Sequence, residues 1–145
     1  MVAGWSAEVD RVSAMAEIEK SEKITINLGL VDLGQIDLLV QEGFYANRTD
    51  FIRSAIRTQL ATRAAAVEQS VARRTLVLGS AHFTRSQLEE VRRAGQTLQI
   101  RVLGLATIAA DVSPKLALQT IASVEVLGAF RASAAVKAAL ASRIV

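Results

Sequence analysis

The chain has 145 residues, of which 51% are apolar and only 4% aromatic, so its core must be built mainly from Ala, Val, Leu and Ile. It has no cysteine and a single histidine, His82, which excludes disulfides and thiolate metal sites and argues against a histidine-based metal site within one chain. The net charge is +3, but residues 1–63 hold seven basic and nine acidic residues, so any attraction to nucleic acid must depend on where the charges lie.

Residues 1–21 form an N-terminal arm whose apolar residues Trp5, Val9, Val12 and Ala16 have helical spacing. A loose acidic arm and a short amphipathic helix both fit this pattern. Acidic residues interrupt the arm where a signal peptide would be basic and then apolar. No apolar run in the chain approaches the eighteen or so residues that cross a bilayer. These patterns predict a cytoplasmic protein.

Residues 22–63 predict one strand followed by two helices. Residues 23–28 alternate between polar and apolar types, which places alternate side chains on opposite faces of a strand. The first helix has an apolar stripe and a stop at Gly43. The second begins at an Asn47 N-cap with Asp50 three positions later, a variant of the capping box. The expected inward residues are Ile24, Ile26 and Leu28 in the strand, Leu33, Ile36, Leu39 and Val40 in the first helix, and Phe51, Ile52, Ala55, Ile56 and Leu60 in the second.

A single strand with two short helices buries too little apolar surface to fold alone. Two copies solve this problem, because their strands can pair antiparallel while four helices cover the apolar face. The polar face of such a ribbon displays Lys23, Thr25 and Asn27 twice. A two-stranded ribbon of this width fits the major groove of B-DNA.

This stretch resembles the ribbon-helix-helix DNA-binding proteins of the Arc, MetJ and CopG type. The resemblance covers residues 22–63 and includes K-I-T-I-N-L, the first helix that ends at a glycine, and N-R-T-D-F-I-R-S-A-I-R. It implies an intertwined homodimer in which the outward strand residues Lys23, Thr25 and Asn27 contact base edges. It further implies that Asn47, Arg48 and Thr49 bind DNA phosphates at the start of the second helix. Lys suits guanine, Asn suits adenine and the Thr methyl suits thymine.

Residues 64–74 lack Gly and Pro and predict a connecting helix, which either prolongs the second helix or forms a helix of its own. Residues 75–145 then predict a small α/β domain. The tripeptide Val-Leu-Gly occurs in it three times, ending at Gly79, Gly104 and Gly128. Each glycine is preceded by a strand-like segment, over residues 75–78, 98–103 and 124–127. Each is followed by a helix-like one, over residues 85–93, 113–121 and 133–141, and an aliphatic residue stands twelve positions after each glycine (Val91, Leu116 and Leu140).

A fixed period in the twenties favours a solenoid-like stack of parallel strands with helical crossovers. The overall class is therefore α+β, with a ribbon-helix-helix part and a strand–helix repeat domain. The alternative is a βαββαβ sandwich, which would fold residues 98–109 into a hairpin around Gly104. Ligand-binding modules of that kind occur in some ribbon-helix-helix repressors, but His82 alone cannot supply the several histidines of a nickel sensor.

Candidate catalytic groups are weak. The carboxylates Glu89, Glu90 and Asp111 and the lone His82 lack the spacing of acid–base, phosphate-binding or metal motifs, so we expect neither an enzyme nor a cofactor. Arg53 and Arg57 are better explained as a solvated helix face than as a second DNA contact.

The leading hypothesis is a sequence-specific regulator of transcription, a repressor associated with the nucleoid, that binds double-stranded DNA as a homodimer. Its C-terminal half would join dimers into a larger oligomer. One alternative is an antitoxin whose C-terminal half binds a toxin protein. A more distant alternative is a DNA-organising or filament-forming structural protein.

Overall fold

The computed structural model describes residues 21–145, which divide into two compact units, residues 21–70 and residues 71–145. All of the expected N-terminal arm except Ser21 lies outside the described residues. Helices and strands are both present, so the expected α+β class is confirmed. No described helix is long and apolar enough to cross a membrane.

The first unit contains α2 (Leu30–Gln41), α3 (Arg48–Thr62) and the first part of α4 (Ala64–Arg74). The α2 helix ends in a Schellman motif, in which the Gly43 amide donates to the Val40 carbonyl and the Phe44 amide to the Leu39 carbonyl. Gly43 has φ of 83°, which a residue with a side chain adopts only at a cost. The stop predicted at Gly43 is confirmed.

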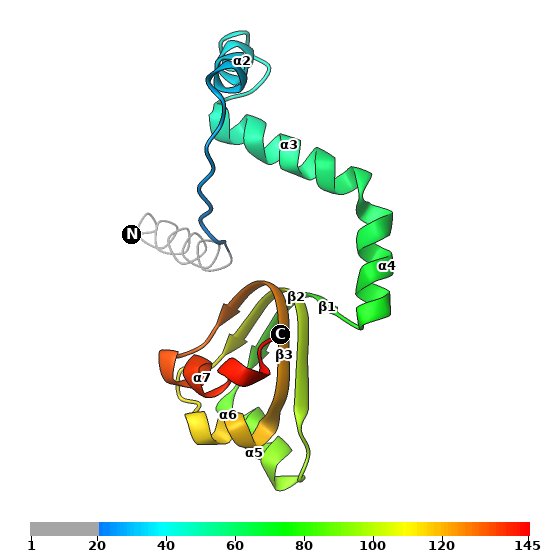
Figure 1. Cartoon of the computed structure of the whole chain (residues 1–145), viewed down its shortest axis with the longest axis vertical. Coiled ribbons are helices and arrows are strands. Elements are labelled where there is room, and N and C mark those ends of the chain that lie inside the picture. The colour runs from blue at the N-terminus through cyan, green and yellow to red at the C-terminus, as the bar shows by residue number, and fades with distance from the viewer. Residues whose placement is uncertain (1–20) are drawn as a thin grey trace, which may run out of the picture. The chain divides into compact units, whose positions relative to one another are not determined.

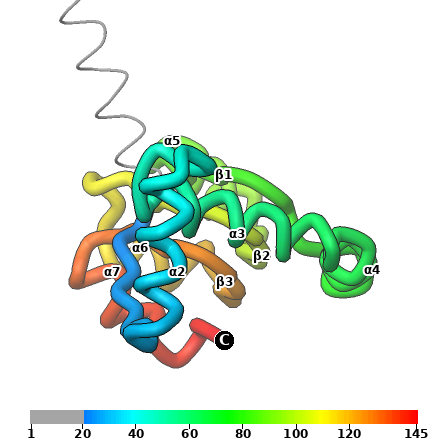
Figure 2. The backbone as a smooth tube through the Cα atoms, turned by 90° about the horizontal axis from the view of Figure 1, so that it is seen from above, coloured from blue at the N-terminus to red at the C-terminus, as the bar shows by residue number. Residues whose placement is uncertain are grey.

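The connecting segment forms a helix of its own rather than a continuation of α3. The chain changes direction between α3 and α4, as Figures 1 and 2 show. Arg63 separates the two helices, with φ of −109° and ψ of 9°. The boundary between the two compact units falls inside α4, after Ser70.

The second unit is a parallel three-stranded sheet in the order β1 (Val77–Phe83), β2 (Leu98–Ile108) and β3 (Ile121–Arg131). The crossover helices are α5 (Arg85–Arg93) and α6 (Pro114–Thr120), and β3 is followed by α7 (Ala134–Ala139) and a short 3₁₀ turn (Ala141–Arg143). All three helices lie on one side of the sheet (Figure 1).

Each of these helices begins at a hydroxyl side chain that caps its first turn. Thr84, Ser113 and Ser133 accept hydrogen bonds from the backbone amides of Gln87, Leu116 and Val136. At α5 the cap is reciprocal, because the Gln87 side chain accepts from the Thr84 amide. These caps place the helix starts within one residue of the positions expected from sequence.

A single apolar core lies between the sheet and its helices. The buried side chains of β2 (Ile100, Val102, Ala106 and Ile108) all have the same parity, as period two requires. The buried members of the core are Leu88, Ile100, Val102, Ala106, Ile108, Val112, Leu116, Ala117, Ile121, Val124, Val136 and Leu140.

The strands extend further than expected. The predicted segments ended before each glycine, whereas β1, β2 and β3 continue through the glycines to Phe83, Ile108 and Arg131. That part of the prediction was wrong. The alternative hairpin around Gly104 is also absent, because residues 98–108 form one continuous strand.

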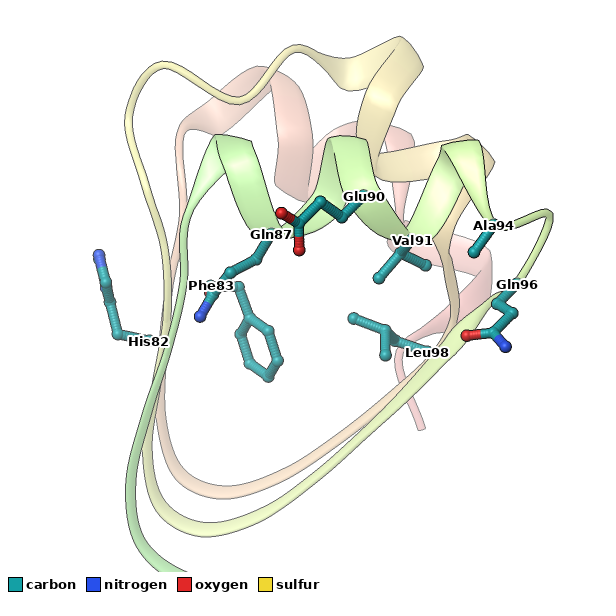
Figure 3. Close-up of a pocket in the computed structure, with 8 residues that line it drawn as sticks. All are labelled: His82, Phe83, Gln87, Glu90, Val91, Ala94, Gln96 and Leu98. Atoms are coloured by element: carbon teal, nitrogen blue, oxygen red, sulfur yellow. The ribbon is translucent and has the colours of Figure 1, made fainter.

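The three glycines lie side by side at the same register position, Gly79 against Gly104 and Gly104 against Gly128. Their φ angles are 122°, 138° and 122°. A Cβ on Gly104 would lie 3.0 Å from the Gly79 carbonyl carbon and closer still to its oxygen, and a Cβ on Gly128 would meet Gly104 in the same way. Glycine therefore lets the strands curve strongly (Figure 3) while neighbouring backbones stay in pairing distance.

Candidate nucleic-acid interface

The segment of residues 21–29 leads into α2 and carries the first set of predicted DNA-binding residues. Among the described residues it belongs to no helix and pairs with no strand, and all nine of its residues are exposed. Ile24 is 73% exposed and Ile26 56% exposed, alternating with Lys23, Thr25 and Asn27. An extended segment with polar side chains on one face and apolar side chains on the other needs hydrogen-bond partners for its backbone groups. It also needs other apolar groups to cover its apolar face.

The helices that follow leave much of their own apolar surface uncovered. Ile36, at 6% exposure, is the one buried apolar residue among residues 21–70. Phe51 and Ile52 are half-buried, and the Tyr45 and Phe51 rings pack edge to face with centroids 5.0 Å apart. From α2 to α4, the exposed large apolar residues are Leu30, Val31, Leu38, Phe44, Ile56, Leu60 and Val67. Ala55, Ile56 and Leu60 were expected to face inward, but in the single chain they face solvent.

The second predicted set lies at the first turn of α3. The Asn47 side chain accepts a hydrogen bond of 2.8 Å from the Asp50 amide, so this residue is an N-cap. Asp50 accepts a hydrogen bond of 3.0 Å from the Ala46 amide, one residue before the position of a standard capping box. The exposed Arg48 and Thr49 begin the helix, where amide groups and the helix dipole favour an anion.

Arg48 makes an ion pair that the sequence analysis missed. Its guanidinium donates to both carboxylate oxygens of Asp37 on α2, with distances of 2.7 Å and 2.8 Å. The hydrogen bond from Arg48 lowers the pKa of Asp37 below its ordinary value, and the same bond raises the pKa of Arg48. The pair joins α2 to α3 and holds a carboxylate beside a cation expected to bind phosphate.

The two predicted sets belong to one compact unit, but within the described residues no hydrogen bond or ion pair joins them. Lys23, Thr25 and Asn27 lie along the extended segment, whereas Asn47, Arg48 and Thr49 lie at the start of α3. Arg53 and Arg57 are exposed on α3. Bringing both predicted sets against one duplex would require either a change in the segment or a second chain.

The carboxylates of the second unit have ordinary surroundings. Glu89 pairs within α5 with Arg85 at 3.1 Å and with Arg93 at 3.8 Å. Asp111 is exposed. In the described part of the chain no group of three or more His, Asp or Glu residues is placed to hold a metal ion.

The match to a known protein family covers more of the chain than residues 22–63, which carry the recognisable motifs. The model of the ribbon-helix-helix transcriptional regulator family matches residues 19–137, so the match includes most of the C-terminal unit as well as residues 22–63. No curated protein and no solved structure matches the chain significantly. Because the family model covers most of the chain, this protein belongs to the ribbon-helix-helix transcriptional regulators, a family of DNA-binding proteins.

Proposed function

We propose that the protein is a sequence-specific transcriptional repressor, without catalytic activity, that binds DNA as a homodimer. The extended segments of two copies pair antiparallel, and their outward residues Lys23, Thr25 and Asn27 enter the major groove. The observation that carries this proposal is the alternation of exposed Ile24 and Ile26 with those polar residues, beside two helices that leave their apolar surface open.

The dimer supplies what the single chain lacks. Pairing of two segments provides partners for their backbone groups, and the exposed side chains of both chains then share one core. The same arrangement doubles each DNA-binding residue. Two copies of Asn47, Arg48 and Thr49 flank the ribbon and bind phosphates, which set the position of the protein without reading sequence.

Arg48 changes its ionic partner when the protein binds DNA. In the single chain Asp37 holds its guanidinium in a bidentate pair. A DNA phosphate also offers two oxygens for a bidentate contact, and the DNA backbone has a higher local negative charge, so Arg48 exchanges one anion for another on binding. Asp37 therefore orients Arg48 before DNA arrives and competes with the phosphate for it.

The C-terminal unit joins dimers into a larger particle. Linked dimers occupy neighbouring half-sites with a higher effective concentration than separate ones, without any new base contact. Repression follows when such a particle covers a promoter. We place this activity in the cytoplasm, at the nucleoid.

The test replaces Thr25 and Asn27 with Ala and compares footprints on genomic fragments selected by the wild-type protein. Each lost base contact should reduce discrimination by about 1–3 kcal/mol, or roughly 5- to 150-fold. Non-specific binding at low salt should persist, because the phosphate contacts remain. Arg48→Ala is the matched control, since it should weaken specific and non-specific binding together. An unchanged footprint for Thr25→Ala with Asn27→Ala would contradict the assignment.

A further inference from the structure

Strand β1 forms one edge of the parallel sheet and, among the described residues, pairs only with β2. The edge position leaves β1 more exposed than its neighbour, as a comparison of the exposed fractions of paired residues shows. Val77 and Val102 are partners and point to the same face of the sheet, yet Val77 is 57% exposed and Val102 only 2%. The central strand is covered because it has a neighbour on both sides, and β1 has one.

The apolar core is also open at this end. Figure 3 shows Phe83, Val91 and Leu98 pointing into a pocket under α5, with His82 turned away from it. Val91 is half-buried, whereas Leu116 and Leu140, which stand at the same distance from their glycines, are buried. Within residues 71–145, the stack of strand–helix units therefore lacks a cover on the β1 side.

The sequence of β1 does not protect this edge. Val77–Phe83 reads V-L-G-S-A-H-F and contains no Lys, Arg, Asp, Glu or Pro, the residues that usually prevent edge-to-edge pairing. Gly79 adds to the openness, because a Cβ at that position would meet nothing within 4 Å. At Gly104 and Gly128 the corresponding space is filled by the preceding strand.

The opposite edge differs. Ile144 forms a parallel bridge with Val124, and the Val145 amide donates to the Val124 carbonyl at 2.9 Å. Arg143 fixes this C-terminal segment by donating to the carbonyls of Leu118 and Ile121. Strand β3 also carries the charged residues Glu125 and Arg131. A strand added to β3 in the register of the sheet would meet the C-terminal residues at Val124.

We propose that β1 pairs antiparallel with β1 of a second copy of this chain, so that two three-stranded sheets become one continuous sheet. The partner edge is again β1 because the β3 edge is partly covered. A two-fold contact between identical edges also closes, whereas head-to-tail stacking would not. This pairing identifies the surface that joins dimers, and so it rests on the proposed function. The joined particle contains more than two chains.

The main experiment compares two substitutions at one register position on opposite edges, Leu78→Glu on β1 and Leu127→Glu on β3. Leu78 and Leu127 both pair with Leu103 and are both exposed, at 69% and 44%. Sedimentation of the full-length chain should give more than two chains for the wild type and for Leu127→Glu, but two for Leu78→Glu. Loss of assembly in both variants, or in neither, would overturn the proposal, as would a wild type of two chains.

A second measurement does not depend on the folding of a charged variant. The chain has no cysteine, so a single introduced thiol can form only an inter-chain disulfide. Cysteine placed in turn at each residue from Val77 to Phe83 should produce a covalent dimer under mild oxidation where that residue lies opposite its own copy, because antiparallel partners come within disulfide reach. Leu127→Cys should remain uncrosslinked. Failure at every β1 position, or equal crosslinking at Leu127, would contradict β1 pairing.

DNA binding separates this inference from the function on which it rests. Leu78→Glu should still footprint a single half-site with the selectivity of the wild type, because its N-terminal unit is unchanged. If neither this variant nor the wild type selects a sequence while β1 crosslinking persists, the proposed function fails and the pairing stands. If selectivity is retained and crosslinking is absent, the pairing fails alone.

Discussion

Alanine substitutions at the three in-register glycines test why the sheet needs glycine. Gly79, Gly104 and Gly128 all have positive φ, so Ala at any of them adds backbone strain of roughly 1–3 kcal/mol. At Gly79 the new Cβ meets open space, but at Gly104 and Gly128 it meets the backbone of the preceding strand. Backbone cannot rotate aside as a side chain can, so we expect a further cost of about 1–3 kcal/mol, typical of overpacking.

Gly79→Ala should therefore lose roughly 1–3 kcal/mol, and Gly104→Ala and Gly128→Ala about 2–6 kcal/mol. The larger loss is comparable with the whole stability of a small domain. Urea unfolding followed by circular dichroism measures the difference, and the Leu78→Glu background removes any contribution from pairing through β1. Equal losses at all three positions would show that backbone conformation alone, and not the approach of the strands, selects glycine.

Three further predictions concern the proposed DNA interface. Asp37→Asn should raise operator affinity at fixed salt, because it releases Arg48. Arg48→Ala should lower the slope of log affinity against log salt by about two per dimer, one for each phosphate contact. A loss of affinity in both variants would show that the ion pair only holds α2 against α3. The pKa of Asp37 is lowered in the folded chain, so the stability that its pair contributes is present above the ordinary carboxyl value of 3.8 and lost as the pH falls towards the lowered pKa. The urea midpoint should then fall more steeply below pH 3.8 for the wild type than for Asp37→Asn, and parallel curves would contradict this. Asn47→Ala removes the helix cap and should lower the free energy of unfolding by about 1 kcal/mol. Asn47→Asp should keep the cap and weaken only DNA binding, because it adds negative charge beside the phosphate. Equal stability of the two variants would exclude a role for the cap.

Helix limits could be predicted from the sequence because they depend on local chemistry. Gly43, Asn47, Thr84 and Ser133 each satisfy backbone groups within four residues of themselves, and such short-range patterns are visible in sequence. The break at Arg63 carries no such signal. It has neither Gly nor Pro, and the segment was open to interpretation as a continuation of the helix.

The extent of the strands was missed because glycine was treated as a stop. The alternation in fact continues across it, since Val102 and Ala106 on either side of Gly104 are both buried. Following the apolar residues at every second position past the glycine would have predicted the longer strand. Gly104 fits because its neighbour is another glycine, and that fact depends on the register between strands.

The ion pair between Asp37 and Arg48 was beyond sequence reasoning for a different reason. The two residues stand on separate helices, eleven positions apart, so their contact depends on the angle between α2 and α3. Nothing in either helix fixes that angle locally. Arg48 was singled out for its place at a helix start, and its anionic partner became visible only in three dimensions.

A second copy of the chain would contribute differently to the two units. The second unit closes a core of its own between sheet and helices and leaves one strand edge open. The first buries Ile36 alone, so its core has to be shared with another chain. In the proposed assembly, dimerisation through the first unit is part of folding itself, whereas contact through β1 adds to a unit that is already formed. The interface that reads DNA should consequently survive changes at β1, while changes at Ile24 or Ile26 should remove the fold and the DNA-binding surface together.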